Sequence, residues 1–325
     1  MKLLSPNEYI EQATVAISRA KKRVSFISMV ITDDDSTDEL LNALAAAAKR
    51  GVEVRVAGDM FTYTELSGQF IPSHYYSKKV RSTTRMARTL SRAGVDFHWL
   101  GRLSITTFSG RTHSKWCVVD DIVFSFGGVN LYEEATYNAD YMFHTKNKLL
   151  ADTLFTEHQR IVRADKKSHA YRSHSLKLND TSAVLFDAGL FGDSLIYERV
   201  CYLAGQSKHI TYVSQYCPTG KLTRLLRRTN SILYFNQWQT AQHFNRLIIR
   251  VGMFLTRQQT SYRRSAYLHA KCIIFEHEDG TKTAITGSHN FVHGGVLLGT
   301  REVALETSDS SIIEQLETFI EKYIS

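Results

Sequence analysis

The pattern of apolar and polar positions in the first half of the chain recurs in the second half. Residues 9–31 read as an amphipathic helix, a basic turn and an apolar strand, and residues 194–216 repeat that order. A second helix and a short strand candidate follow in each half, at 39–51 and 52–58 and again at 221–230 and 231–237. Strands that alternate with helices predict an α/β domain, and here the pattern predicts two similar ones.

Each half then reaches a pair of apolar strands that reads as a hairpin. In the second half, residues 278–281 supply Glu-Asp-Gly-Thr, which is typical of a turn. In the first half only Asp120 and Asp121 separate the two strands, so we expect a tighter turn there.

A polar, basic stretch without clear periodicity separates the two halves. We therefore predict an N-terminal domain over 1–161, a basic linker over 162–180 and a C-terminal domain over 181–325. The length of 325 residues fits two medium domains. One continuous domain with coincidental internal similarity is the alternative.

Composition limits the class of protein and the class of partner. Hydrophobic residues make up 43% of the chain and charged residues 22%, which excludes pervasive disorder. The net charge of +8 and the pI of about 9.2 favour an anionic partner, either nucleic acid or an acidic membrane surface. A basic surface that serves only solubility is the alternative.

The cysteines and the apolar runs indicate where the protein resides. The four cysteines form no Cys-x-x-Cys pair, and Cys117 and Cys272 lie within apolar runs, so we expect buried thiols and a reducing compartment. The first residues lack the apolar core of a signal peptide, and no window reaches the roughly 18 apolar residues of a spanning helix. We expect a cytoplasmic protein that can lie peripherally on the inner face of the membrane.

The tripeptide His-x-Lys occurs in matching places of the two halves. The first copy is His113-Ser114-Lys115, and the second is His269-Ala270-Lys271. In extended backbone, residues i and i+2 point to the same side, so each histidine should enter a site together with its lysine. One such tripeptide would mean little, but two copies in similar surroundings indicate function.

Each copy continues with an acid and then a glycine-containing segment. Asp120 and Glu276 follow their lysines after four intervening residues, and the segments Gly127–Asn130 and Gly287–Asn290 come next. Small residues let a phosphate approach the backbone, and an asparagine amide can donate to its oxygens. The candidate substrate-binding residues are Gly128, Asn130, Ser288 and Asn290.

A carboxylate opens an apolar strand near the end of each half. Asp140 follows Asn130 by ten residues, and Glu302 follows Asn290 by twelve. We expect each carboxylate to accept a hydrogen bond from histidine Nδ1–H and so to complete its own half. That contact would fix the tautomer and leave Nε2 free to attack.

These motifs resemble the signature of the phospholipase D superfamily: His-x-Lys, four residues, Asp, six residues, then Gly-Gly or Gly-Ser and x-Asn. The first copy matches throughout, whereas the second has Glu276 in place of Asp, an acid that is usually structural in the family. The tail of the second motif looks most like the bacterial cardiolipin synthase and phosphatidylserine synthase branch. The resemblance covers nearly the whole chain. It implies two α/β domains related by a pseudo-twofold with one shared active site, for which a monomer suffices.

The resemblance also implies a phosphodiesterase or phosphatidyltransferase that needs no metal and no cofactor. By analogy His113 attacks phosphorus to form a phosphohistidine and His269 serves as acid and base, although internal symmetry leaves the two roles reversible. The predicted catalytic residues are His113, Lys115, Asp120, Asp140, His269, Lys271, Glu276 and Glu302. A zinc site built from histidines and carboxylates is the chemical alternative, and the charge of the paired lysines argues against it.

Two further patterns bear on the substrate. A helix over 78–92 would carry one basic stripe, which suits anionic lipid headgroups or a nucleic-acid backbone, with a solvated face as the alternative. The stripe consists of Lys78, Arg81, Arg85, Arg88 and Arg92. Some aromatic residues are expected in the core, with an apolar entrance to the site as the alternative. They are Tyr63, Tyr75, Tyr76, Trp99 and Phe108.

Three functions follow from the sequence. The favoured one is a phosphatidyltransferase or phospholipase that acts on phospholipids at a membrane surface. A metal-independent nuclease that cleaves DNA or RNA is the second, although the sequence has no interleaved basic and aromatic strip for stacking bases. A catalytically silent phosphate-binding module is the third, and the intact histidines and lysines argue against it.

Overall fold

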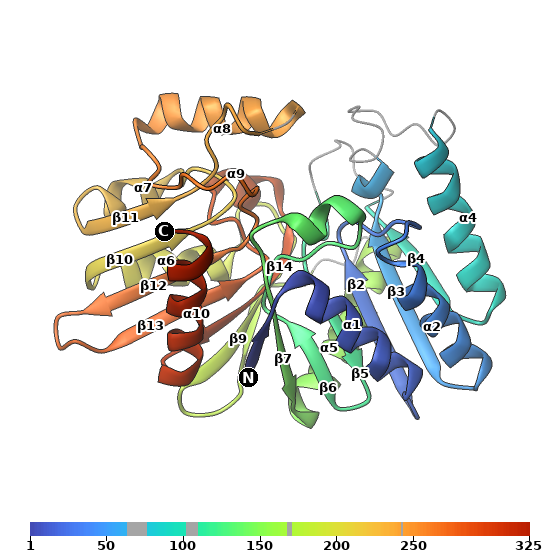
Figure 1. Ribbon diagram of the computed structural model, residues 1–325. Coiled ribbons are helices and arrows are strands. Elements are labelled where there is room, and N and C mark those ends of the chain that lie inside the picture. Colours follow the sequence, from blue (N-terminus) through green and yellow to red (C-terminus); the bar gives the residue numbers. More distant parts are fainter. Residues whose placement is uncertain (64–76, 102–109, 168–170, 242) are drawn as a thin grey trace.

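The computed structural model describes residues 1–63, 77–101, 110–167, 171–241 and 243–325. In this part of the chain two seven-stranded mixed sheets lie side by side, each with helices packed against it (Figure 1). The α/β class and the two similar domains predicted from the sequence are confirmed.

The first half builds its sheet in the order β1-β7-β6-β5-β2-β3-β4. Its first helix begins at a capping box, in which the Ser5 side chain accepts from the Glu8 backbone and Glu8 reaches back to Ser5. The elements are β1 (Lys2–Leu4), α1 (Pro6–Ser18), β2 (Arg23–Ser28), α2 (Asp38–Lys49), β3 (Glu53–Asp59), α4 (Lys78–Arg92), β4 (Asp96–Leu100), β5 (Trp116–Val119), β6 (Ile122–Ser125), the 3-10 helix η1 (Glu133–Tyr137), β7 (Met142–Lys146) and α5 (Lys148–Lys167).

The second half builds its sheet in the order β11-β10-β12-β13-β14-β9-β8. Its elements are β8 (His174–Lys177), β9 (Ser182–Ala188), α6 (Leu195–Ala204), β10 (Ser207–Val213), α7 (Lys221–Leu226), β11 (Asn230–Tyr234), α8 (His243–Thr256), β12 (Cys272–His277), β13 (Lys282–Gly287), α9 (His293–Leu298), β14 (Arg301–Thr307) and α10 (Ser310–Tyr323).

Six strands of one sheet correspond to six strands of the other, in the same spatial order. The run β1-β7-β6-β5-β2-β3 matches β9-β14-β13-β12-β10-β11, and in both runs only the last two strands are parallel. Each half adds one strand of its own, β4 at one end and β8 at the opposite end. The internal repeat in the sequence is therefore a repeat of architecture.

The predicted hairpins are confirmed. Only Asp120 and Asp121 join β5 to β6, and Asp120 takes a left-handed φ of 53° there, a conformation that Asp tolerates better than most residues. Residues 278–281 join β12 to β13, and Gly280 has a φ of 81°. These turns fix the register of the strands that carry the candidate site.

One apolar core joins the two halves. It contains Trp116 of the first sheet and Cys272 of the second, both fully buried. The ring of Tyr141 lies edge-on to Phe319 of α10, with 4.8 Å between the ring centroids, and Gln315 of α10 hydrogen-bonds the backbone of the first strand. Because this core is continuous, the two sheets are held in a fixed relation to each other.

The predicted linker is wrong in part. Residues 162–167 continue α5, and His174–Lys177 form the edge strand β8, which pairs with β9. The polar composition of 162–180 reflects one exposed helix end and one sheet edge, which need few apolar residues. The division into two domains at this stretch stays a prediction.

Other expectations from the sequence have mixed outcomes. All four cysteines are free and buried. Lys78–Arg92 form the predicted helix, with its basic stripe exposed. Tyr63 is buried against Trp99 with 5.0 Å between ring centroids, while Tyr75, Tyr76 and Phe108 lie outside the described residues. Among the described helices, none is both long enough and apolar enough to cross a bilayer.

Candidate active site

The two His-x-Lys segments lie where the two sheets meet. Each segment stands just before a strand, β5 or β12, and each pairs with backbone of the other half. His113 N donates to the Arg301 carbonyl at 2.8 Å, and His269 N donates to the Ala139 carbonyl at 3.0 Å. The histidine of one half is therefore held beside the strand that opens with the carboxylate of the other half.

A polar clamp fixes the residue before each histidine. The buried Asp59 accepts from Thr112 N at 2.7 Å and pairs with Arg111 at 2.8 Å. In the second half, the Asn236 side chain accepts from Leu268 N at 2.9 Å and donates to the Leu268 carbonyl at 2.7 Å. Both clamps follow from buried polar groups that must find partners, and they position the two tripeptides alike.

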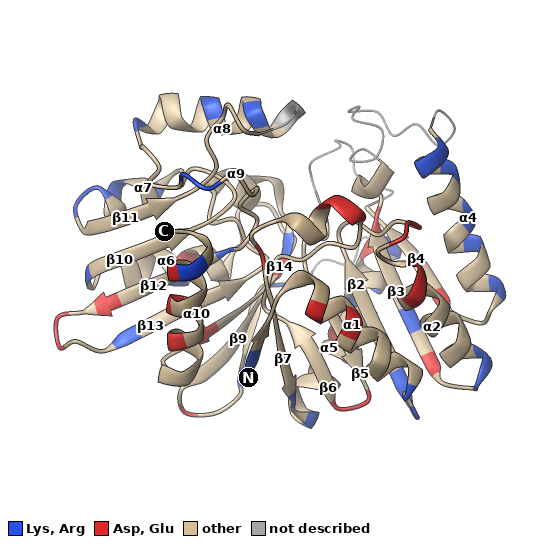
Figure 2. Cartoon of the chain, viewed as in Figure 1, with Lys and Arg blue, Asp and Glu red and all other residues tan. Residues whose placement is uncertain are grey.

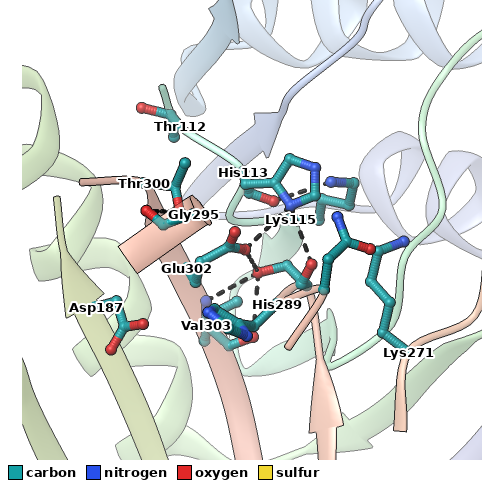
Figure 3. A network of polar contacts seen from close by, with 12 residues as sticks. Thr112, His113, Lys115, Asp187, Lys271, His289, Gly295, Thr300, Glu302 and Val303 are labelled. Carbon is teal, nitrogen blue, oxygen red and sulfur yellow. Dashed lines mark hydrogen bonds and ion pairs between the residues drawn. The ribbon is translucent and has the colours of Figure 1, made fainter. Parts of the chain in front are cut away.

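The histidines and carboxylates pair crosswise between the halves. Nδ1 of His113 lies 3.1 Å from the Glu302 carboxylate, and Nδ1 of His269 lies 2.7 Å from the Asp140 carboxylate. Figure 3 shows the first of these pairs. The expectation that each carboxylate serves its own half is wrong, because the strand that each carboxylate opens runs past the other half's tripeptide.

These contacts determine the histidine tautomers. Nδ1 of His113 faces only acceptors, the Glu302 carboxylate and the Ser288 carbonyl at 3.0 Å, so Nδ1 carries the hydrogen and Nε2 carries a free lone pair. Burial lowers the pKa of His113 and lowers the pKa of His269 to about 4, with Lys271 adding to the second effect. Both imidazoles are therefore neutral at pH 7, the state in which a histidine can attack phosphorus.

The carboxylates stay ionised in spite of their burial. Burial alone would raise the pKa of Glu302, but His113, His289 and a hydrogen bond from Ser288 outweigh it and lower that pKa to about 2. For Asp140, His269 and Lys271 likewise outweigh burial and lower the pKa. Each carboxylate is thus a permanent acceptor for its histidine.

Two buried lysines bring positive charge to the same place. Nζ of Lys115 donates to the His113 carbonyl at 2.9 Å, and Nζ of Lys271 donates to the His269 carbonyl. Burial lowers the pKa of Lys115 to about 8 and that of Lys271 to about 7, where repulsion from Lys115 contributes. An anion that entered between them would relieve both effects, so the pair is suited to binding phosphate.

Gly128 and Ser288 hold matching places but act differently. A side chain at Gly128 would stand 2.7 Å from the His269 carbonyl and 2.8 Å from both Asp140 carboxylate oxygens, so only glycine fits. The Gly128 amide donates to Asp140 at 3.1 Å, whereas the Ser288 hydroxyl donates to Glu302. Each position therefore supports the carboxylate of its own half.

The two asparagines of the motifs are buried with an unused polar atom. Asn130 is 5% exposed and Asn290 is 9% exposed, and neither Oδ1 has a hydrogen-bond partner in the described part of the chain. An unpaired buried polar atom costs about 1–3 kcal/mol, so two at matching positions require an explanation. A ligand that brings a hydrogen-bond donor to each Oδ1 would satisfy both atoms.

The placement of Asp120 and Glu276 in the site is wrong. Asp120 lies at the far end of β5, about 16 Å along the strand from Lys115, and accepts from the backbone amides of Lys21, Lys22 and Arg23. Glu276 lies in β12 and forms a surface ion pair with Lys208 at 2.9 Å. Both acids stabilise the start of a neighbouring strand.

Sequence reasoning missed two groups near Glu302. His289 is 2% exposed, and its Nδ1 accepts from Phe291 N at 2.8 Å, which places its hydrogen on Nε2. Asp187 stands opposite Glu302 in the register of β9 and β14, and burial raises its pKa to about 8. His289 lies within the motif segment Gly287–Asn290, but the matching residue of the first half is Val129. The internal repeat therefore did not mark His289 as a candidate.

Metal coordination was the chemical alternative at the sequence level. Among the described residues, no group of three or more His, Cys, Asp and Glu side chains is arranged to hold a metal ion.

Comparison with known proteins finds a family match in the first half of the chain and similar structures over both halves. The sequence of residues 14–162 matches the family described as "Cardiolipin synthase, PLD-like domain". The phosphatidylserine synthase of Haemophilus influenzae has a similar structure, with a TM-score of 0.73 and 15% identity over 100% of this chain and 86% of that chain. The resemblance to the phospholipase D superfamily is confirmed.

A second solved structure is similar over about half of its own length. The polyphosphate kinase of Porphyromonas gingivalis matches with a TM-score of 0.64 and 12% identity, over 98% of this chain and 49% of that chain. No curated protein matches the chain. The family match therefore covers most of the first half of the chain, and the two solved structures share its fold over both halves.

Proposed function

We propose that this protein is a metal-independent phosphatidyltransferase or phosphodiesterase that acts on phospholipids through a phosphohistidine. The observation that carries the proposal is the crosswise pairing of His113 with Glu302 and of His269 with Asp140 around two buried lysines. The pairing gives one site two neutral imidazoles, each with a free Nε2. Two-step displacement at phosphorus requires such a pair of groups.

In the first step Nε2 of His113 attacks phosphorus and forms the P–N bond. The bond from phosphorus to the leaving alcohol breaks, and His269 gives that oxygen a proton. In the second step water or an alcohol passes a proton to His269 and attacks phosphorus, and the P–N bond breaks. The anionic substrate raises the pKa of His269 on entering, so His269 takes from solvent the proton that it lacks in the free protein at pH 7.

The remaining residues act on charge and orientation. Glu302 and Asp140 stabilise the imidazolium that develops on their partners and hold each ring in place. Lys115, Lys271 and the amide groups of the two asparagines would surround the phosphoryl oxygens, where preorganised donors contribute most to the rate.

A phospholipid is the favoured substrate because of the branch of the family. The match over residues 14–162 is to a cardiolipin synthase-type domain, and the phosphatidylserine synthase shares the fold over the whole chain. The acceptor decides whether the reaction is hydrolysis or transfer: water yields phosphatidic acid, whereas glycerol, serine or a second lipid yields a new diester.

Purified protein incubated with phosphatidylglycerol vesicles in the presence of a chelator tests the proposal. We expect release or exchange of the headgroup, detected as phosphatidic acid or a new phospholipid by mass spectrometry. The His113→Asn variant is the control for contaminating activity. Turnover of single-stranded DNA without any lipid product would contradict a lipid substrate, and activity that depends on added zinc would contradict the mechanism.

A further inference from the structure

Helix α8 is attached to the protein along one side only. Ile249, Gly252 and Thr256 face inward, and the Thr256 hydroxyl lies 3.1 Å from Cys217 Sγ. Asn245, near the start of the helix, accepts from the Tyr216 hydroxyl at 2.6 Å. Figure 1 shows α8 lying along the outer edge of the C-terminal half.

The opposite side of α8 is apolar and faces solvent. The exposed fractions are 57% for Leu247, 45% for Val251, 81% for Phe254 and 72% for Leu255. Spacings of four, three and one place these side chains on one face of the helix. A surface helix normally turns polar residues to water, so an apolar outer face indicates that something else covers it.

Positive charge accompanies this apolar face. Arg246 and Arg250 flank it, both exposed, and no acidic side chain lies within ion-pair distance of either among the described residues. Residues 199–275 contain twelve lysines and arginines and no aspartate or glutamate. The formal charge of this stretch therefore exceeds the net charge of the whole chain, which is +8. Figure 2 shows basic residues on α8 and on the neighbouring α7.

The other basic helix offers a contrast. Helix α4 carries the exposed stripe that includes Arg85 and Arg88, but its apolar residues, such as Val80 and Leu90, are buried. In the described part of α4 no large apolar side chain is exposed. Helix α4 is therefore an ordinary amphipathic helix, whereas α8 combines charge with an apolar face turned outward.

We propose that α8 docks the protein on an anionic lipid bilayer, with Leu247, Phe254 and Leu255 entering the interface and Arg246 and Arg250 contacting the headgroups. A basic helix with an apolar face is the usual form of an interfacial anchor. A second copy that docks through the same face is disfavoured because Arg246 and Arg250 of one copy would meet those of the other. Nucleic acid is disfavoured because three of the four exposed apolar side chains, Leu247, Val251 and Leu255, have no ring on which bases can stack.

Docking by α8 rests on the proposed function, since it would bring the active site to its lipid substrate. Its test is separate because binding to vesicles requires no turnover. Sedimentation with phosphatidylglycerol vesicles and with phosphatidylcholine vesicles measures docking. Hydrolysis of soluble bis(p-nitrophenyl) phosphate measures the chemistry without a membrane.

Two double variants of α8 test the two components. Leu247→Ser with Phe254→Ser is expected to weaken binding to phosphatidylglycerol vesicles by about tenfold or more. Arg246→Gln with Arg250→Gln is expected to weaken it by about tenfold, and to change nothing on phosphatidylcholine. Both variants should keep their turnover of the soluble diester.

Matched controls lie in the first half of the chain. Val15→Ser with Leu149→Ser removes two exposed apolar helix residues, 43% and 50% exposed, and should leave binding unchanged. Arg85→Gln with Arg88→Gln removes the same charge from α4 and should weaken binding by less than about threefold. As an independent readout, Phe254→Trp should add fluorescence that shifts to the blue when phosphatidylglycerol vesicles are added.

The outcomes separate the two proposals. Binding that depends on α8 without lipid turnover supports the docking surface and contradicts the function. Lipid turnover with binding unaffected by the α8 variants overturns the docking surface and leaves the function standing. Equal losses from α4 and α8, or an α8-dependent dimer in ultracentrifugation, also overturn it.

Discussion

Glu302 lies 3.1 Å from Nδ1 of His113, although 189 residues separate them in the chain. Asp140 and His269 form the reciprocal contact across 129 residues. Neither half can complete a histidine–carboxylate pair by itself. The shared site is therefore built into the pairing of the two halves, and each pair offers a direct test.

Glu302→Gln is expected to lower kcat by about 10²–10⁴-fold without unfolding the protein. The amide keeps the shape of the side chain but removes the charge that stabilises an imidazolium on His113. Steady-state kinetics on a soluble phosphodiester measure the loss, and circular dichroism checks the fold.

Glu306→Gln on the same strand is the matched control. Glu306 pairs with Arg199 away from the histidines, so its loss should change kcat by less than about threefold. Similar rates for Glu302→Gln and for the wild type would refute a role for the crosswise pair.

Gly128→Ala is expected to reduce activity by at least about a hundredfold. The added methyl group would stand 2.8 Å from the Asp140 carboxylate oxygens, so Asp140 and with it His269 must move, and small displacements at a reacting group are costly. Gly294→Ala is the control, because nothing lies within 4 Å of a methyl group there. Normal turnover in Gly128→Ala would show that the position of Asp140 is unimportant.

The lysines predict the alkaline limb of the pH profile. In the free protein the pKa is about 7 for Lys271 and about 8 for Lys115, so both lose their charge as the pH rises through this range. The ratio kcat/KM for an anionic substrate already decreases above the pKa of His269, about 4, because that histidine must gain a proton, and it should decrease more steeply above about pH 7 and again above about pH 8. The Lys271→Arg variant stays charged, so its kcat/KM should be lower overall but should lack the additional decrease near pH 7. A ratio that still rises at pH 9 would rule out charged lysines as phosphate ligands.

Asp120→Ala is expected to cost about 1–2 kcal/mol of stability at pH 7 while kcat stays within about threefold. Burial opposes the ionised form of Asp120, but the amides of Lys21, Arg23 and Lys22 outweigh it and lower its pKa. A lowered folded pKa means that this stability is present above the unfolded pKa and is lost as the pH falls through the folded pKa.

Thermal melts of both proteins at pH 7 and at about pH 3 test this assignment. The difference in Tm between wild type and Asp120→Ala should shrink at the lower pH. A large loss of kcat with an unchanged Tm would instead place Asp120 in the chemistry.

The sequence predicted much of the fold because it repeats. Matching periodicities predicted two similar α/β units, and the turn residues at Asp120 and at 278–281 predicted both hairpins. Local chemistry decides such features, so a single sequence is enough to find them. The stretch 162–180 was misjudged because a sheet edge and a helix end can be as polar as a linker.

The site was harder to predict because it depends on distant packing. Motif spacing located the histidines, the lysines and both carboxylates, but it assigned each carboxylate to the nearer histidine in the chain. The true partners follow from backbone pairing of Arg301 with the first tripeptide and of Ala139 with the second. Asp120 was placed in the site because the family signature includes it, whereas β5 carries it about 16 Å away.

Trapping the covalent intermediate tests the central claim most directly. His113→Asn and His269→Asn, mixed with a soluble phosphodiester and quenched in base, are compared by mass spectrometry for an acid-labile phosphoryl group on an imidazole. Both variants are expected to lose turnover, and the adduct is expected to accumulate only in His269→Asn, on Nε2 of His113. Near-normal turnover in both variants, or no adduct in either, would contradict a phosphohistidine mechanism.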